Sequence, residues 1–420
     1  MSLHFFVAAG MATTLLALGS ATAGADELPS PLRLSDLIAA VRQRNPEIAE
    51  ALGMARAAAA RPRAAGLLED PMLSLEWWQQ PVTFANVPLM LTVRQPLPWP
   101  GRLRVRRQVA EREAVTARDR TGETARRIEA QAKRAFFDLS LAESELDVNT
   151  RIYTLIDNMV RTVEARYKVG KATQAEILKT QSDLLTVENE RIDLERNRDE
   201  ARTRINALLD RAGDATVPPT AALGERVSLA PIAELIAAVA AHRPEVQIAR
   251  DTLAEAEARL ALDRRESNPE LAVWAAYQVN THSADTFTLG ASTTLPFFSS
   301  VKRRALVDSA DAVVRARRAA IEAATRAAER DVRTALFQID TADRHARLHA
   351  DKLIPLAELS LQSAEAAYQN NRIDLFAVLD AAKMVRDHHL NHARYLIEYQ
   401  RRIADLEQAL GLDVPREVAR

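Results

Sequence analysis

The chain contains no cysteine among its 420 residues. This absence excludes disulfide bonds, thiolate metal sites, a cysteine nucleophile and a lipid anchor on cysteine. Glycine and proline are scarce, at 12 and 18 residues, which favours long helices over a sheet-rich enzyme with many tight loops. The 56 basic residues nearly balance the 57 acidic ones, so no overall basic field indicates a nucleic-acid partner.

Motifs of enzymes are also missing. The sequence has no glycine-rich phosphate loop, no His-Glu-x-x-His helix and no nucleophile elbow, so we predict neither catalysis nor a cofactor. Histidines recur four residues apart at His345 and His349 and again at His388 and His392, with His389 adjacent. This spacing places two imidazoles on one helix face, as a zinc or copper site requires. Two neutral ligands do not complete a structural site, so the sequence predicts no metal.

Residues 1–25 have the pattern of a cleaved export signal. An apolar run from Phe5 to Leu18 is followed by small residues, and Ala23-Gly24-Ala25 fits a small-x-small cleavage site. No later stretch has about 18 consecutive uncharged apolar residues, so no transmembrane helix is predicted. If the chain spans a membrane, it must do so as part of a closed β-barrel.

The remaining sequence contains a large internal repeat. The eight residues from Leu34 return, with few changes, 198 residues later. The offset is 200 at Ala135 and Ala335, and 201 at Tyr167 and Tyr368. A register held over this length indicates duplication of one unit. The predicted divisions are a first repeat at 26–210, a linker at 211–231, a second repeat at 232–412 and a C-terminal tail at 413–420.

Each repeat contains a predicted β-hairpin, at about 71–97 and 270–297. In the second hairpin Phe287, Leu289 and Ala291 alternate with small polar residues, as in a strand between lipid and water. Soluble hairpins that pack aromatic residues on a core remain the alternative. Aromatic residues in or beside the strands suggest a girdle at a membrane interface: Trp77, Trp78, Trp99, Trp274 and Phe297.

Long helical hairpins are predicted at about 102–209 and 302–410. Apolar and small residues recur by three and four along the first, which favours one helix from Arg102 to Lys168, about 100 Å long. In the second repeat the same pattern continues through His349 and on to Leu353 and Leu356. Asn149 and His349 occupy matching positions on this seam, where polar residues commonly fix the register.

Turn residues predict where the helices begin and end. Ser35 is the expected N-cap of a short first helix. Gly170 is expected to take a positive φ angle and end the long helix, and Thr173 to cap the returning one. In the second repeat Asn371, which tolerates the left-handed conformation, replaces that glycine.

These features together resemble the TolC family of outer-membrane efflux channels, over essentially the whole chain after residue 25. The resemblance implies a mainly α fold with a small β part, and a homotrimer whose 12 strands form one barrel below which the helices form a tunnel. It also implies an outer-membrane location in a Gram-negative bacterium, contact with lipid, and passive export rather than catalysis. The motifs that carry it are Arg166-Tyr167-Lys168-Val169-Gly170 with Glu176 and Leu178, and Ala367-Tyr368 with Val378-Leu379-Asp380-Ala381.

The resemblance assigns roles to the two hairpin tips. The tips of the family meet a periplasmic adaptor protein, and side chains near them close the tunnel entrance. This chain departs from the family pattern at the second tip, where Ile373 replaces the gate arginine and Ala377 an acidic residue. The implied docking residues are Val169, Gly170, Lys171, Asn370, Asn371 and Arg372, and the implied gate residues are Glu176, Tyr368, Arg372 and Asp380.

Two further stretches resemble the CzcC and CusC branch, which serves heavy-metal efflux. They are Glu69-Asp70-Pro71-Met72 and the segment from Gln95 to Arg102. The branch implies an inner-membrane pump of the RND type. Drug efflux and type I secretion remain alternatives, as does a soluble periplasmic coiled-coil scaffold, which would lack lipid-facing strands.

Overall fold

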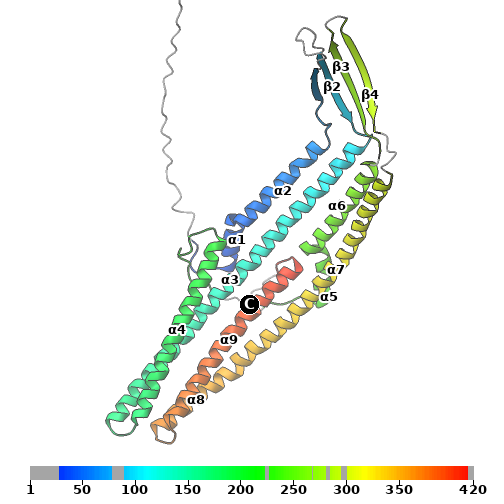
Figure 1. The fold of residues 1–420 in the computed structure, drawn as a ribbon. Coiled ribbons are helices and arrows are strands. Elements are labelled where there is room, and N and C mark those ends of the chain that lie inside the picture. The colour runs from blue at the N-terminus through cyan, green and yellow to red at the C-terminus, as the bar shows by residue number, and fades with distance from the viewer. Residues whose placement is uncertain are drawn as a thin grey trace, which may run out of the picture.

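The computed structural model describes residues 28–77, 89–222, 227–266, 268–280, 284–294 and 300–414. The predicted export signal lies outside these residues, as do Trp78, Phe297 and parts of the predicted linker and tail. Within them the molecule is elongated, with a small sheet at one end and two helical hairpin tips at the other (Figure 1).

The sheet has four antiparallel strands in the order β1-β2-β3-β4. The strands agree closely with the two predicted hairpins. Strands β2 and β3 pair with each other along their full length, so the sheet joins the two repeats. The strands are β1 (Met72–Trp77), β2 (Leu89–Leu97), β3 (Leu271–Val279) and β4 (Thr286–Thr293).

The helices follow the same order in each repeat. No helix among the described residues is both long and apolar enough to cross a membrane. The first repeat has α1 (Leu34–Arg44), α2 (Pro46–Ala65), α3 (Arg102–Lys168) and α4 (Gln174–Leu208). The second has α5 (Ile232–His242), α6 (Pro244–Glu266), α7 (Ser300–Leu348), the π-helix η1 (His349–Leu353), α8 (Ile354–Gln369) and α9 (Leu375–Leu410).

Helix α3 is one uninterrupted helix of 67 residues, as predicted, and its rise is about 100 Å. Near the sheet it packs between α2 and α6, and near the tips it packs between α4 and α9. The second repeat continues the same layer. Helix α7 packs on α6 near the sheet, and α7 and α8 pack on α9 toward the tips. The result is a single curved layer of helices, with α2 and α4 along one edge and α7 and α8 along the other (Figure 1).

The predicted tip turns are confirmed. Gly170 has a φ of 72° and Asn371 a φ of 54°, so both take the left-handed conformation that ends a helix. Thr173 caps α4 through a complete capping box. The prediction that Ser35 caps the first helix is wrong. Helix α1 begins at Leu34 without a side-chain cap, and the Ser35 hydroxyl lies one residue inside the helix.

The predicted seam of the second repeat is wrong beyond His349. Leu356 is exposed, and Ala357 takes the buried position instead. The cause is η1, because a π-helix accommodates one extra residue and shifts every later side chain by one position. The same extra residue explains why the offset between the repeats grows from 200 at Ala135 to 201 at Tyr167.

The two repeats bury equivalent cores. In the first, Leu37 and Val41 of α1 pack on the middle of α3 with Ile128 and Leu139. In the second, α5 packs in the same way on α7. Each short helix therefore covers one side of the layer at mid-height, where the long helices of its own repeat need an apolar partner.

Charged side chains join α3 to α9, and so the first repeat to the second. The ammonium of Lys133 lies 2.6 Å from a carboxylate oxygen of Glu407, and both side chains are nearly enclosed, with 7% and 4% exposed. Further pairs along the same interface are Arg134 with Asp405 at 3.2 Å, Arg401 with Asp138, and Arg394 with Glu145 at 2.7 Å.

The neighbouring pairs of Lys133 and Arg134 allow a matched comparison. Lys133→Ala removes the buried ammonium that lies 2.6 Å from the Glu407 carboxylate, so we expect it to lower the free energy of unfolding by about 3–5 kcal/mol. Arg134→Ala is the control, because the Arg134 side chain is 57% exposed and its pair contributes about 0–1 kcal/mol. Denaturant unfolding of the two variants measures the difference, and equal losses would contradict a special role for the Lys133–Glu407 pair.

Candidate gate and docking surfaces

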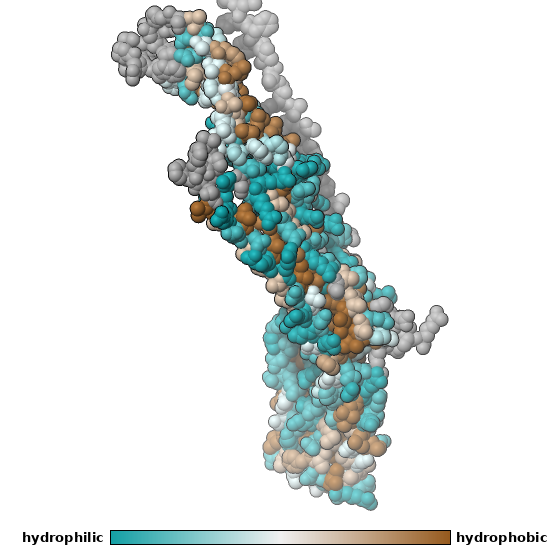
Figure 2. All heavy atoms as spheres, turned by 90° about the vertical axis from the view of Figure 1, so that its right-hand side faces the viewer, coloured by the Kyte–Doolittle hydropathy of each residue, from teal (hydrophilic) through white to brown (hydrophobic). Residues whose placement is uncertain are grey.

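The sheet has one nearly continuous apolar face. Residues paired across neighbouring strands lie on the same side of a sheet. Phe287 pairs with Tyr277, Tyr277 with Leu91, and Leu91 with Leu75, so one row of large apolar side chains crosses all four strands. All four side chains are exposed. Hydrophobic residues gather along one side of the sheet in Figure 2.

The opposite face of the sheet is more polar. Its rows contain Thr92, Arg94, Thr288 and Ser292. The exposed, contiguous apolar surface on the first face marks a contact with lipid or with another protein, and such a surface is unusual on a soluble monomer. The alternation predicted for the second hairpin is therefore present across the whole sheet.

The predicted interface aromatics occupy different environments. Trp77 ends β1 and Trp99 follows β2, and both are exposed. Trp274 instead lies on the more polar face, in the same row as Arg94, and its ring covers Gly290, its partner on β4. A Cβ atom at residue 290 would come within 2.4 Å of the Trp274 ring, so only glycine leaves room for this indole.

At the far end of the molecule, the predicted gate residue Glu176 belongs to the helix cap of α4. Its carboxylate accepts a hydrogen bond from the backbone N–H of Thr173 at 2.6 Å and one from the Thr173 hydroxyl at 3.1 Å. The carboxylate thus fixes the start of α4 beside the first tip. The carboxylate is also close enough to Tyr368 of the second tip to raise the pKa of the Tyr368 phenol.

Arg166 connects the two tips, and its role was missed by sequence reasoning. Its guanidinium lies over the Tyr368 ring, 4.3 Å from the centroid, which is a cation–π contact. The same guanidinium donates to the backbone carbonyl of Gln369 at 3.4 Å and to the side-chain carbonyl of Asn371. One side chain at the end of α3 therefore contacts three residues of the second tip, Tyr368, Gln369 and Asn371. We call this set the tip contact.

Tyr368 is buried in the tip contact. Burial raises the pKa of its phenol, the nearby Glu176 carboxylate raises it further, and Arg166 acts in the opposite direction. The phenol therefore stays neutral. The ring provides the negative π face that a cation prefers, without adding a charge of its own.

A groove lies between the first hairpin and α9, just above the tips. Its volume is about 590 Å³, and we call it the inter-repeat groove. Its floor is apolar, with Ile156, Val187 and Leu379, and its rim is charged on both sides. The charged rim residues are Lys179, Asp183, Glu190, Asp380, Lys383 and Arg386.

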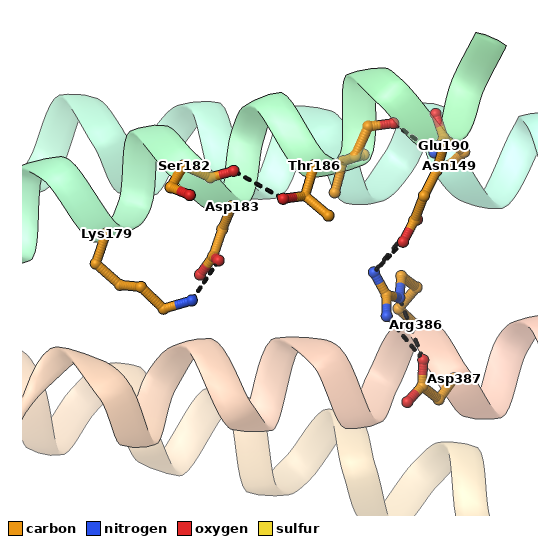
Figure 3. Close-up of polar contacts among 9 residues, drawn as sticks. Asn149, Lys179, Ser182, Asp183, Thr186, Glu190, Arg386 and Asp387 are labelled. Atoms are coloured by element: carbon orange, nitrogen blue, oxygen red, sulfur yellow. Dashed lines mark hydrogen bonds and ion pairs between the residues drawn. The ribbon is translucent and has the colours of Figure 1, made fainter.

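Polar contacts define the wall of the inter-repeat groove (Figure 3). Arg386 of α9 reaches both carboxylate oxygens of Glu190 on α4 at 3.3 Å, and it also contacts Asp387 at 3.2 Å. Asn149, predicted to fix the register, donates its side-chain amide to the backbone carbonyl of Val187 at 3.0 Å. Asn149 therefore holds α3 against α4, whereas Arg386 and Glu190 hold the first hairpin against α9.

The other predicted tip residues are open to solvent. Val169, Lys171, Asn370 and Asn371 are exposed at the two turns. The exposed Arg372 is not part of the tip contact, whereas the exposed Asp380 lines the groove. The structure thus brings Glu176 and Tyr368 together and leaves Arg372 and Asp380 apart from them. The sequence does show basic residues in the last turn of α3, Arg166 and Lys168. The spacing of these residues along the chain does not reveal which of them faces the second tip.

Comparison with known proteins identifies the fold and the family. The outer-membrane channel OprN has a TM-score of 0.77 to this chain at 18% identity, over 90% of this chain and 89% of OprN. The outer membrane protein VceC of Vibrio cholerae has a TM-score of 0.77 at 17% identity, over 91% and 97%. CusC has a TM-score of 0.77 at 16% identity, over 90% and 92%. No curated protein matches the sequence.

The family of outer membrane efflux proteins matches residues 37–211 and again residues 235–412. The chain belongs to this family. The two matched spans are the two repeats, so the duplication and the mainly helical fold with four strands are both explained. The efflux protein is a transport protein of the Gram-negative outer membrane, not an enzyme, and its helices extend into the periplasm. Proteins of the family form trimers that work with an adaptor and an inner-membrane pump.

The tip contact predicts the effect of one substitution. Arg166→Ala removes the cation over Tyr368 and two hydrogen bonds, interactions of about 0.5–2 kcal/mol each at such sites. We expect the two tips to separate more readily and single-channel conductance in planar bilayers to rise. Lys168→Ala removes an exposed charge two residues away and is expected to leave conductance unchanged. Equal conductance of the Arg166→Ala variant and the parent would remove Arg166 from the gate.

Proposed function

We propose that this efflux protein is the passive exit duct of a tripartite pump, formed by three copies of the chain. The observation that carries the proposal is that one chain has free edges along its whole length. In the described chain, both the sheet and the layer of helices have two edges without a partner. In each case the two edges can pair with each other between neighbouring copies.

The free edges of the sheet are β1 and β4. Each pairs with one neighbour only, so each leaves a row of backbone N–H and C=O groups unpaired along its other side. Joining β4 of one copy to β1 of the next satisfies both rows. Three copies with four strands each then give a closed sheet of twelve strands, with the apolar row of Phe287 and Leu91 toward lipid.

The free edges of the helical layer carry apolar side chains. Leu178, Leu185 and Ile192 on α4 are exposed and lie seven residues apart, which is the repeat of a coiled-coil seam. On the other edge Leu356 and Leu359 of α8 are exposed. Packing α4 of one copy on α8 of the next covers both sets. The helices of three copies then surround a tunnel that continues from the closed sheet.

The tips are proposed to meet the adaptor. Val169 and Lys171 at the first tip and Asn370 and Arg372 at the second are exposed and polar or small enough to contact an incoming helical hairpin. Energy would come from the inner-membrane partner, because the chain has no nucleotide-binding motif.

Assembly can be tested on the α4 edge. Leu185→Asp places a charge in the proposed contact between copies, so we expect the variant to lose the trimer on size-exclusion chromatography in detergent. Asn197→Asp is the matched control, because it adds the same charge to an exposed position of the same helix that is turned away from the line of Leu178, Leu185 and Ile192. The parent protein should show threefold symmetry by electron microscopy. A trimer that tolerates Leu185→Asp, or images without threefold symmetry, would contradict the proposed packing.

Heavy-metal cations are the proposed substrates. The proposal is supported by the resemblance of residues 69–72 and 95–102 to the CzcC and CusC branch, and by the exposed Asp380 near the tips. Three copies of Asp380 around a narrow entrance would favour cations. An RND-type pump is the inner-membrane partner that this branch implies. Drug efflux is the second candidate, and it does not require cation preference at the entrance.

Ion selectivity in bilayers tests the role of Asp380. Asp380→Ala removes three negative charges from the trimer, so the reversal potential in a salt gradient should shift toward lower cation preference. Lys383→Gln removes a positive charge from the same groove rim and should shift the preference in the opposite direction. Unchanged selectivity in Asp380→Ala would exclude this carboxylate from the entrance and weaken the metal proposal.

A further inference from the structure

The second repeat has a cluster of histidines where the first repeat has one asparagine. The counterpart of Asn149 is His349, the first residue of η1. Only 7% of His349 is exposed, and its Nδ1 atom is buried without a hydrogen-bond partner in the described part of the chain. Asn149 is satisfied by the Val187 carbonyl, so the two equivalent positions are chemically different.

Aromatic rings surround His349 at the interface of η1 and α7 with α9. The His349 and His388 rings have centroids 5.3 Å apart, and the His388 Nδ1 atom is also buried without a partner. Tyr395 lies 5.4 Å from His349 and stacks on His345 at 4.6 Å. His392 is one turn beyond His388 on α9. We call the four imidazoles of His345, His349, His388 and His392 the histidine cluster.

The histidine cluster is arranged for proton uptake. Among the residues that the structure describes, no three His, Asp or Glu side chains are placed to hold a metal ion. An unpaired imidazole nitrogen accepts a proton near neutral pH, and histidine is the side chain whose charge changes in this range. The unpartnered Nδ1 atom of His349 is such an acceptor, and the His388 ring lies beside it, with the two centroids 5.3 Å apart.

The surroundings of His349 oppose its charged form. Burial lowers the pKa of His349, and the imidazoles of His388, His392 and His345 lower it further, while the backbone carbonyl of His388 acts the other way. Burial and His389 lower the pKa of His392, against the attraction of Asp351.

Two other charged groups near the cluster, Glu358 and Arg347, have partners. Glu358 of α8 lies 3.0 Å from His389, and Arg347 pairs with Asp343. Since the packed state lowers these pKa values, the packing is fully stable above the ordinary histidine pKa of about 6.5. As the pH falls below about 6.5, the unpacked state binds protons first, so the stability of the packing decreases. The decrease is complete once the pH is below the lowered pKa values of the packed histidines.

We propose that the histidine cluster is a proton sensor that loosens the second helical hairpin in acid. Protonation places like charges in a closely packed interface and so separates η1 from α9. The break falls at the π-helix, where the helix is least regular, and α8 leads directly from it to Tyr368 in the tip contact. Acid would therefore favour opening at the second tip. This consequence rests on the proposed function, whereas the separation of the helices does not.

Distances between spin labels test the separation directly. The chain has no cysteine, so Gln362→Cys on α8 and Met384→Cys on α9 introduce the only two label sites, both exposed. Full-length labelled chain is diluted with unlabelled chain before assembly, so that each trimer carries at most one pair. We expect the inter-label distance to lengthen between pH 7.5 and pH 5, with a midpoint below about 6.5. No change with pH would overturn the proposal.

Substitutions assign the change to the cluster. His349→Asn, the residue of the first repeat, should abolish the pH response, and His388→Gln should do so if the first variant does not assemble. His242→Asn removes an exposed histidine on α5 and should leave the response intact. An unaltered response in both cluster variants would refute the assignment. Asp251, whose pKa burial and Asp119 raise to about 6, titrates in the same range between α6 and α3, and it would then be the source.

Channel conductance separates this inference from the proposed function. If the protein conducts at pH 7.5 but neither conductance nor the label distance responds to acid, the sensor fails and the duct stands. If the label distance responds and no conductance is seen at any pH, the sensor stands and the duct fails.

Discussion

The architecture depends on helix α3 being continuous. This helix of 67 residues reaches from the sheet to the first tip. Among the described elements it packs on helices of both repeats, on α2 and α6 near the sheet and on α4 and α9 near the tips. Because α6 and α9 of the second repeat both pack on it, the second repeat is aligned with the first over nearly the whole length of the molecule. A break in α3 would weaken the link between the sheet and the tips, because the other main contacts between the repeats in the described chain are those of β2 with β3 and of α4 with α9.

The contacts along α3 differ in character with height. At mid-height the buried pair of Lys133 and Glu407 requires both partners in place, which makes this level specific and rigid. Near the tips the two repeats share an apolar core, in which Met159 and Val163 of α3 pack with Leu361 of α8 and with α9. The polar contacts at this level, made by Arg166 and by Arg386 with Glu190, are partly solvated. The repeats are therefore joined by a buried ion pair at mid-height, and by apolar packing with solvated polar contacts near the tips.

Much of the fold could be predicted from the sequence, because local chemistry decides it. The strands alternate with period two, and α3 contains no proline and only one glycine, Gly122. Gly170 and Asn371 tolerate the left-handed conformation that ends a helix, and Thr173 has the hydroxyl that caps one. Ser35 was mispredicted because α1 begins at Leu34, two residues before the start that a cap at Ser35 implies, and has no side-chain cap. Leu356 was mispredicted because a heptad pattern assumes a constant number of residues per turn, which η1 violates.

The candidate site was less predictable than the fold. Tyr368 and Glu176 do lie together, but Arg166 contributes through contacts between residues about 200 positions apart, and no local pattern reports them. Arg372 and Asp380 are near in sequence to Tyr368 yet point to solvent and to the groove, because successive residues after a helix turn face different directions.

The single extra residue in η1 also makes the two halves of the chain mechanically unequal. The first hairpin has regular helices tied by Asn149, whereas the second carries an irregular turn of backbone above its tip. In a ring of three chains, stiff and compliant hairpins would alternate around the rim. Such a rim would not open evenly. The second hairpins would move outward before the first hairpins, so the opening would widen with threefold, triangular symmetry.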